Sequence, residues 1–277
     1  MGRGHDGSIA RRAAGLCVGL FLLGCTEFEP GTDELTGTTE VTDQLTPGVG
    51  RDWSCVGSVP TRSFGTDPGA AITYTVRAID IGTLDPIPDM TVRVCALTDV
   101  ECDMPVIDRL EVDAQGWVDV PLTENFSGYL ELESPTTVPG SLYLGGGLRT
   151  MTEFPLLMIT VPAFQGLMAA VGVTEDPAAG HVSIRTFDCQ SDTAPGATLS
   201  NNTGGVPFYF TNGLPDITLR ETDDDGLGGY VNVPAGVTAV QSRLADGTLV
   251  DRRSFIVRPG WFVSSFMRPA GFQPPAP

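Results

Sequence analysis

The sequence predicts an all-β protein built of β-sandwiches, and three observations lead to this fold class. Glycine and proline are abundant, with 34 and 22 residues among 277. Long helical patterns of apolar residues are nearly absent. From Trp53 onward, short segments of alternating apolar and polar residues are separated by turn signals, which is typical of sheets joined by many turns.

The strands are identified by alternation, because successive side chains of a strand point to opposite faces of its sheet. The run Ile-Thr-Tyr-Thr-Val-Arg-Ala at Ile72–Ala78 shows this pattern clearly. The same criterion predicts strands, in chain order, at Ile72–Ala78, Thr91–Cys95, Trp117–Val120, Tyr129–Glu133, His181–Phe187, Val206–Phe210, Tyr230–Val233, Val237–Leu244, Leu249–Val257 and Trp261–Met267.

An internal repeat is visible in two of the turn-and-strand segments. Val112–Pro121 (VDAQGWVDVP) recurs as Thr222–Pro234 (TDDDGLGGYVNVP). The first aspartates, Asp113 and Asp223, are 110 positions apart, which is about the size of one β-sandwich module. An Asx residue, a glycine and an outgoing strand closed by proline predict a hairpin in each copy. The second copy adds three residues, Leu227–Gly229, which we expect at the turn.

Further motifs accompany both copies. Pro86–Val94 (Pro-x-x-Asp-Met-x-Val-x-Val) precedes the first, while Gly180–Ile184, Pro195–Ala197 and Asn232–Gly236 accompany the second. This order resembles carboxypeptidase regulatory-like domains of the transthyretin-like sandwich group, and it covers most of residues 55–268. The resemblance implies a fold of two tandem transthyretin-like (prealbumin-like or Ig-like) β-sandwich domains. It implies no peptidase residues.

One helix is predicted between the two copies. Pro162 suits its start and Gly172 its end. The apolar residues that follow the helical i, i+3, i+4, i+7 spacing are Phe164, Leu167, Met168 and Val171. Packing at a seam between two domains is the favoured role of this helix, and binding of a partner is the alternative.

The N-terminal residues form an export signal. Its positive charges come from Arg3, Arg11 and Arg12. Ala13–Leu23 is apolar but shorter than the roughly 20 residues that span a bilayer. Leu22-Leu23-Gly24-Cys25 resembles the lipobox of bacterial lipoproteins, which implies cleavage after Gly24 and lipid on Cys25. An ordinary signal peptide or a buried core helix is the alternative.

The predicted organisation follows from these segments. Residues 26–50 are rich in Thr and acidic residues and lack any basic residue, so we expect a disordered tether. The full division is signal peptide 1–24, tether 25–50, first sandwich domain 51–161, helix and linker 162–173, second sandwich domain 174–268 and Pro-rich tail 269–277.

The charge of the chain excludes several partners. The 16 basic residues are all arginine, against 34 acidic residues, for a net charge of −18. Removal of residues 1–24 takes away three arginines and Asp6, which leaves 13 minus 33, or −20. Such a surface repels nucleic acid and anionic lipid headgroups, so we expect no nucleic-acid partner and membrane contact only through the lipid anchor.

Four cysteines remain after removal of the signal and lipidation of Cys25. They are Cys55, Cys95, Cys102 and Cys189, an even number that predicts disulfides in an oxidising compartment. Cys95 and Cys102 are separated by a short predicted loop, which favours their pairing. Cys55 and Cys189 are then left to pair, although a bond from Cys55 to Cys95 or Cys102 stays open. A zinc site is the less favoured alternative, because Cys-x-x-C is absent and one histidine remains.

The sequence offers no catalytic residues and no cofactor site. His181 has no accompanying nucleophile motif, and Gly145–Gly147 lacks the Lys-Ser/Thr of a phosphate loop. The carboxylates of Glu111 and Asp113 are expected in turns and solvent rather than as an acid–base pair. The weak calcium candidate is the run Asp223, Asp224 and Asp225, which lacks the ligand spacing of an EF-hand.

Three functions are compatible with this description. The favoured one is a non-catalytic lipoprotein of the bacterial cell envelope, at the outer membrane, whose sandwiches bind a protein or polysaccharide or serve envelope structure. Thr26 after the lipidated cysteine favours the outer membrane, since aspartate there is associated with inner-membrane retention in enteric bacteria. The alternatives are a periplasmic assembly factor for envelope proteins and a hydrolase of unknown kind.

Overall fold

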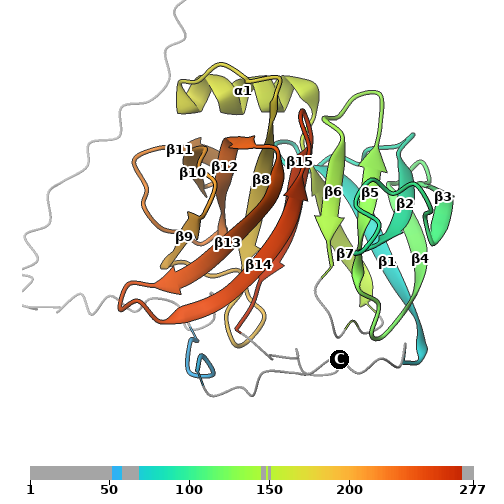
Figure 1. Cartoon of the computed structure of the whole chain (residues 1–277), viewed down its shortest axis with the longest axis horizontal. Helices are drawn as coiled ribbons and strands as arrows, with labels where there is room; N and C mark the ends of the chain where they lie inside the picture. The colour runs from blue at the N-terminus through green and yellow to red at the C-terminus, as the bar shows by residue number, and fades with distance from the viewer. Residues whose placement is uncertain (1–51, 58–68, 145–147, 149–150, 270–277) are drawn as a thin grey trace, which may run out of the picture. The chain divides into compact units, whose positions relative to one another are not determined.

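The computed structural model describes residues 52–57, 69–144, 148 and 151–269, without the side chains of 151–153. The chain divides into two units, Met1–Leu45 and Thr46–Pro277, and every described residue belongs to the second. These residues form fifteen strands and one helix (Figure 1). In chain order they are β1 Ala71–Asp80, β2 Thr91–Ala96, β3 Ile107–Glu111, β4 Trp117–Thr123, β5 Gly128–Glu133, β6 Gly140–Tyr143, β7 Met151–Met158, α1 Val161–Val171, β8 Ala179–Thr186, β9 Ala197–Asn201, β10 Val206–Thr211, β11 Leu214–Asp216, β12 Leu227–Pro234, β13 Gly236–Leu244, β14 Leu249–Val257 and β15 Phe262–Met267.

The first half of this unit is a sandwich of two sheets. In one sheet β1 is antiparallel to β4 and parallel to β7. In the other, β3, β2, β5 and β6 pair in that order, each antiparallel to its neighbour. Alternate residues of β1 and β2, such as Val76 and Val92, are fully buried in one core between the sheets. This is the half-buried pattern that alternation predicts for each strand.

The second half repeats the connectivity of the first. Here β8 is antiparallel to β12 and parallel to β15, as β1 is to β4 and β7. The facing sheet pairs β9 with β13 and β13 with β14, as β2 pairs with β5 and β5 with β6. The two copies of the sequence repeat therefore lie at corresponding positions in two halves that share the same strand connectivity. The chain is an all-β sandwich protein, as expected from the sequence.

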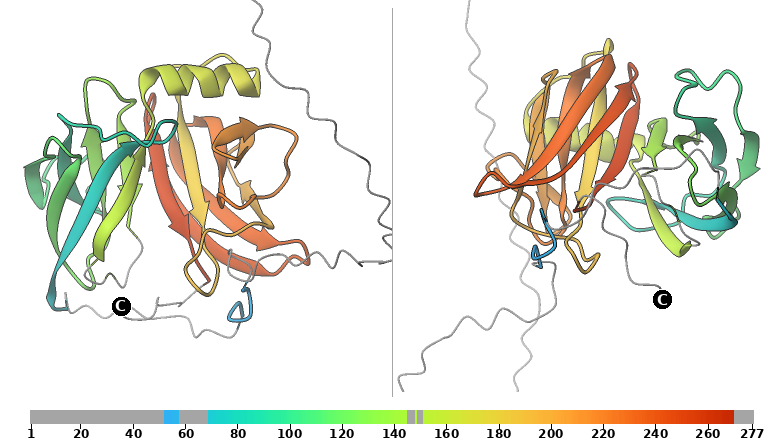
Figure 2. Two further views of the ribbon diagram at one scale, coloured as in Figure 1. Left: turned by 180° about the vertical axis from the view of Figure 1, so that it is seen from behind. Right: turned by 60° about the horizontal axis from the view of Figure 1, so that its bottom comes forward.

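A single strand joins the two halves. β15 pairs in parallel with β8 on one side and with β6 on the other. The result is a continuous nine-stranded sheet in the order β11-β10-β12-β8-β15-β6-β5-β2-β3 (Figures 1 and 2). Its two covering sheets lie on opposite faces, because Leu142 of β6 packs in the core with β1 while its neighbour Tyr143 packs in the core with β13 and β14. The division into separate domains at 51–161 and 174–268 stays a prediction.

Helix α1 begins and ends as the sequence indicates. A proline occupies its first turn, and Gly172 closes it in the left-handed conformation, with φ 70°. The four buried residues of the helix are those at the predicted spacing, Phe164, Leu167, Met168 and Val171. They pack mainly on the second half, against Phe208, Val231 and Phe262, rather than only at a seam between halves. The predicted helix is thus confirmed, and it covers the face of the large sheet opposite β9, β13 and β14.

The repeated Asp-to-Gly turn is not a hairpin, so that interpretation is wrong. β3 and β4 on either side of the first turn lie in different sheets, and β11 and β12 around the second are not neighbours. Each turn instead closes on the end of a central strand: the carbonyl oxygen of Gly116 accepts the N–H of Ala78 at 2.8 Å, and that of Gly226 accepts the N–H of Thr186 at 2.7 Å. Both glycines have positive φ, 86° and 61°.

The three extra residues of the second copy lie in β12, not at the turn. A Cβ on Gly229 would lie 2.0 Å from the carbonyl oxygen of Val182, so only glycine fits there. The register of β12 against β8 shifts between Tyr230 and Val233, and Asn232 has φ 54°. The strand therefore contains a bulge of one residue, while β12, like β4, begins directly after the turn glycine.

Only one of the two prolines of the repeat ends its strand as expected. Pro121 lies inside β4, paired with Thr73, and β4 forms the edge of its sheet. An edge strand tolerates proline because the missing N–H can point away from the partner strand. Pro234 is the last residue of β12, where no further N–H is needed for the ladder.

Candidate functional site

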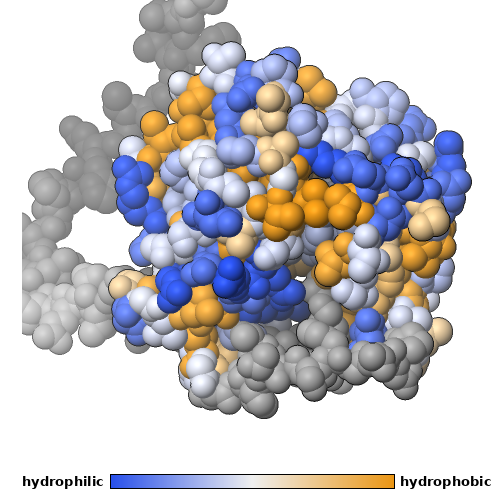
Figure 3. All heavy atoms as spheres, viewed as in Figure 1, coloured by the Kyte–Doolittle hydropathy of each residue, from blue (hydrophilic) through white to orange (hydrophobic). Residues whose placement is uncertain are grey.

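On one face of the large sheet, the strands of the second half pack against a hydrophobic core, while β2, β3 and β5 at the other end carry charged side chains. On β2 and β5, the residues between the buried Val92, Val94, Leu130 and Leu132 point away from the first core. They line a hollow of about 330 Å³ together with residues of β3. The lining residues are Thr91, Arg93, Asp108, Arg109, Glu131 and Glu133. Figure 3 shows a hydrophilic band over the β2, β3 and β5 end of this face, beside apolar surface.

The floor of the hollow is a buried ion network around Glu131. The Glu131 side chain is fully buried, and its two carboxylate oxygens take different arginines. One pairs with Arg93 of the neighbouring strand, and the other accepts from Arg258 at 2.5 Å. A buried carboxylate is stable only when it is paired and hydrogen-bonded, and both conditions are met.

Arg258 connects the two halves through this network. It follows β14 in the second half, yet it binds the Glu131 carboxylate of the first half and donates to the carbonyl oxygen of Val100 at 2.5 Å. Its guanidinium lies over the rings of Trp261 and Tyr129, 4.8 Å and 5.9 Å from their centroids. Although burial opposes it, pairing with Glu131 raises the pKa of Arg258. The arginine is therefore held charged where two strands and a loop meet.

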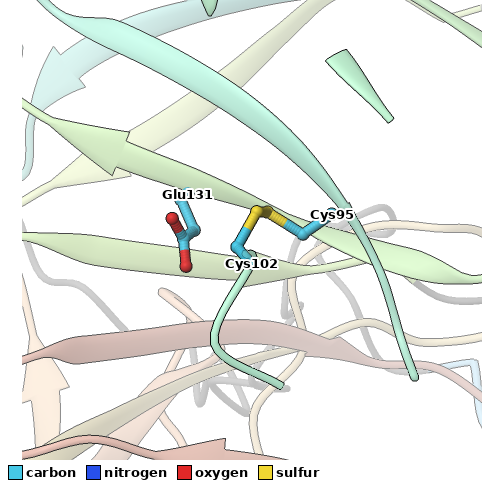
Figure 4. A group of neighbouring side chains, drawn as sticks. All are labelled: Cys95, Cys102 and Glu131. Atoms are coloured by element: carbon cyan, nitrogen blue, oxygen red, sulfur yellow. A yellow bond between two sulfur atoms is a disulfide. The ribbon is translucent and has the colours of Figure 1, made fainter. Parts of the chain in front are cut away.

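The loop between β2 and β3 is fixed to the same network. A disulfide joins Cys95 at the end of β2 to Cys102 in the loop, with their Cα atoms 5.4 Å apart. The two cysteines and Glu131 lie side by side (Figure 4). Burial raises the pKa of Tyr129 to about 12, and its hydroxyl donates to the carbonyl oxygen of Asp99 at 2.6 Å. The loop is thus held by a covalent bond and by side chains of both halves.

Cys95, Cys102 and Glu131 are also the one group of potential metal-ligand side chains brought together in the described part of the chain. The sulfur atoms bond to each other, so they offer no thiolates, and the carboxylate oxygens bind arginines. This donor set does not suit zinc, which needs free thiolate or imidazole ligands.

The second disulfide lies away from this surface. Cys55 bonds to Cys189, with Cα atoms 5.8 Å apart. The Asp188 carboxylate beside it accepts the backbone N–H of Asp52 at 2.9 Å and that of Gln190 at 2.8 Å. The bond therefore attaches residues 52–57 to the turn after β8.

His181 is a core residue. It is fully buried and packs against the rings of Phe164 and Phe262. Its Nδ1 accepts the N–H of Asn232 at 3.3 Å, while Nε2 has no hydrogen-bond partner. Burial lowers the pKa of His181 to about 4, so the imidazole is neutral at physiological pH.

The carboxylates that the sequence offered as an acid–base pair or as calcium ligands bind nearby protein groups instead. Asp113 accepts the N–H of Trp117 at 2.8 Å within its turn, and Glu111 pairs with Arg109. Asp223 accepts from the Thr211 hydroxyl, and Asp225 accepts the N–H of Gly213 at 2.8 Å. The structure does not bring the side chains of Asp223, Asp224 and Asp225 together as a described metal-ligand group.

Several predicted features lie outside the described residues. These are the signal peptide, Cys25, the tether, Gly145–Gly147 and nearly all of the tail. Within the described ranges no helix is long and apolar enough to cross a membrane.

Sequence reasoning missed the network of Arg93, Glu131 and Arg258. A signal was present, because opposite charges stand at polar-facing positions of two predicted strands, in Thr-Val-Arg-Val and Leu-Glu-Leu. The pairing of those strands, and the approach of Arg258 from the other half, depend on the tertiary fold and have no local signal.

Comparisons with known proteins do not assign this chain to a family. Neither the known protein-family models nor the curated proteins match this chain. Among solved structures, the chain is similar to the Bacillus anthracis TIE protein, with 11% identity and a TM-score of 0.25 over 72% of this chain and 34% of that one. It is also similar to the shaft pilin SpaA from Lactobacillus rhamnosus GG, at 9% identity and a TM-score of 0.26 over 74% of this chain and 100% of the other.

A third similar structure is BcpA, the major pilin subunit of Bacillus cereus, at 9% identity and a TM-score of 0.24, over 72% of this chain and 100% of that chain. The chain spans about a third of the Bacillus anthracis protein. TM-scores this low carry no argument about function, so the function rests on the chain's own residues.

Proposed function

We propose that this chain is a lipid-anchored protein of the bacterial cell envelope whose β-sandwich body binds a protein or polysaccharide without catalysis. The anchor is supported by the lipobox-like sequence that ends at Cys25. The observation that supports a binding role most strongly is the surface formed by the charged hollow and the disulfide-fixed loop beside it. Binding sites are commonly side chains and loops held in place by a rigid scaffold.

The chemistry of this surface favours binding over catalysis. Glu131 is neutralised by Arg93 and Arg258, so it is not a free base. The mature chain's one histidine, His181, lies in the core with a lowered pKa. General acid–base and nucleophilic catalysis need a group in contact with the substrate that can exchange a proton. Polar hollows lined by arginine and carboxylate instead suit hydrogen bonding to a polar ligand.

The anchor is tested by the variant Cys25→Ser. We expect the wild-type chain to remain with membranes through washes with high salt and carbonate, and the variant to be released, because several acyl chains hold firmly. Labelling with a radioactive fatty acid should mark the wild type and not the variant. A variant that stays membrane-bound would overturn the lipoprotein proposal.

Surface display is tested by protease treatment of intact cells. We expect cleavage of the exposed body, with a periplasmic marker protein left intact as the control. Complete protection in intact cells, with digestion after the envelope is opened, would favour residence inside and the role of a periplasmic assembly factor.

A further inference from the structure

The β2–β3 loop exposes an unusual amount of apolar surface. Ten large apolar side chains are exposed among the described residues, and four of these lie in one ten-residue segment. They are Leu97, Val100, Met104 and Val106, which are exposed by 46, 38, 81 and 59 percent. We call residues 97–106 the stapled loop. Clustered exposed apolar side chains mark interaction sites, whereas scattered ones need no explanation.

The stapled loop is held rigidly although it is exposed. Besides the disulfide of Cys102, the Asp99 carboxylate accepts the N–H groups of Asp103 at 3.0 Å and Met104 at 2.8 Å. Arg258 and Tyr129 bind its carbonyl oxygens from below. A loop ordered before binding loses less conformational entropy when a partner is bound, so rigidity contributes to affinity.

The charged residues of the loop's own sequence are all acidic. Residues 97–108 contain four carboxylates and no basic residue. They are Asp99, Glu101, Asp103 and Asp108, of which Glu101 lies 3.7 Å from Arg258. The whole chain is also acidic, at −18. Such a loop repels a second copy of this chain and anionic lipid headgroups, and it attracts a basic surface.

We propose that the stapled loop docks into a partner protein, with Met104 as the apolar anchor and the surrounding carboxylates facing arginine or lysine on the partner. The partner's contact surface is therefore an apolar pocket with a basic rim. The unbranched Met104 side chain adapts readily to such a pocket. This inference deepens the proposed binding function, since it names the chemistry of the partner.

The test uses the full-length chain in its own cells, with a photo-crosslinking amino acid at position 104. Position 237 is the matched control, because Val237 is 65 percent exposed on β13 of the other half. We expect a discrete adduct with one protein at position 104 and none at 237. The adduct yield should fall several-fold when salt rises from about 0.1 to 0.5 M, since screening weakens exposed charge pairs.

The identified partner is then purified and its affinity for variants is measured. We expect Met104→Ser to weaken binding at least tenfold, Asp103→Asn to weaken it and reduce its salt dependence, and Val237→Ser to change it less than twofold. Met104 is exposed, so the folded state is unaffected by its loss; circular dichroism confirms this for each variant.

Several outcomes would overturn this inference. They are an adduct of two copies of this chain, an adduct with lipid only, equal yields at both positions, no adduct, or a partner whose affinity is the same for Met104→Ser. Membrane partitioning is measured in the same samples, so that loss of the anchor, which bears on the proposed function, is distinguished from loss of docking.

Discussion

His181 shows that the sequence alone does not distinguish a catalytic histidine from a structural one. A lone histidine at the start of a strand suggests either a catalytic base or a structural residue. Its neighbours Phe164 and Phe262 come from a helix and a strand distant in the sequence, and they make the site apolar. Desolvation then disfavours the imidazolium form.

This burial predicts how stability depends on pH. The folded-state pKa of His181 is about 4, below the ordinary value of 6.5, so between these values the unfolded chain binds a proton that the folded chain does not. Titration of His181 therefore leaves the free energy of unfolding unchanged above about pH 7 and lowers it as the pH falls from there towards 4. From about pH 7 to pH 5 we expect a loss of about 2 kcal/mol from this residue.

Denaturant unfolding at both pH values measures this loss. In the variant His181→Phe, which keeps the aromatic packing, the loss between pH 7 and pH 5 should be smaller than in the wild type by about 2 kcal/mol. The comparison within each protein cancels the cost of the substitution itself. Equal pH dependence in wild type and variant would show that His181 does not titrate on unfolding.

At the scale of elements, alternation located ten of the strands, and the strands that were not predicted are β3, β6, β7, β9 and β11. β14 has the predicted bounds, and β1, β2, β5 and β13 lie within a few residues of them. β6, with four buried residues in the sequence Gly-Ser-Leu-Tyr, shows no polar face because it is covered on both sides. β7 was missed as well; its sequence, Met-Thr-Glu-Phe-Pro-Leu-Leu-Met, includes Pro155.

The loops that follow β1 and β8 also resemble each other, although their sequences do not show it. The Asp80 carboxylate accepts the N–H groups of Gly82 and Thr83 after β1, and Asp188 accepts those of Gln190 and Asp192 after β8. Only the aspartate is shared between these loops, so no motif connects them. Each aspartate accepts the N–H two residues on, but the second N–H it accepts is three residues on in the first loop and four in the second, so the two turns share the Asx-type bond and differ in length.

The two disulfides should contribute unequally to stability. In the loop-entropy model, a bond across the 134-residue separation of Cys55 and Cys189 contributes about 5 kcal/mol, and one across the 7-residue separation of Cys95 and Cys102 about 2.5 kcal/mol. We therefore expect Cys55→Ser to lower the free energy of unfolding more than Cys95→Ser. Chemical unfolding of the two variants beside the wild type gives the comparison.

Peptide mapping without reduction supplies the control for that comparison. We expect one peptide pair containing Cys95 and Cys102 and another containing Cys55 and Cys189, in protein isolated from the envelope. A bond from Cys55 to Cys95 or Cys102, which the sequence leaves open, would contradict the observed arrangement. Four free thiols would remove the disulfides from the account of stability altogether.

At the scale of the whole molecule, the sequence predicted two similar halves but not how they are joined. The repeat indicated that two segments of the chain are alike, and the strand patterns indicated the β-sandwich class. The parallel pairing of β15 with β6 has no local signal, because Phe262–Met267 and Gly140–Tyr143 are far apart in the chain. The two halves are therefore connected by the backbone hydrogen bonds of the shared sheet and by the bond between Arg258 and Glu131.

This arrangement predicts that the two halves unfold together. We expect a single thermal transition in which the calorimetric and van't Hoff enthalpies agree, which is the test for two-state behaviour. In Glu131→Gln, two arginines lose a buried partner, and breaking such a pair costs about 3–5 kcal/mol. Glu133→Gln is the matched control: its side chain is 53 percent exposed and 3.8 Å from Arg93, so it should cost under about 1 kcal/mol.

Hydrogen exchange decides whether Glu131 couples the halves or only stabilises the first. If it couples them, Glu131→Gln lowers the stability of both halves, and amides in β2 and in β13 report the two halves separately. Since Arg258 belongs to the second half and Glu131 to the first, loss of their bond should increase exchange on both sides. Faster exchange in β2 alone would mean that the halves are independent in stability despite their shared sheet.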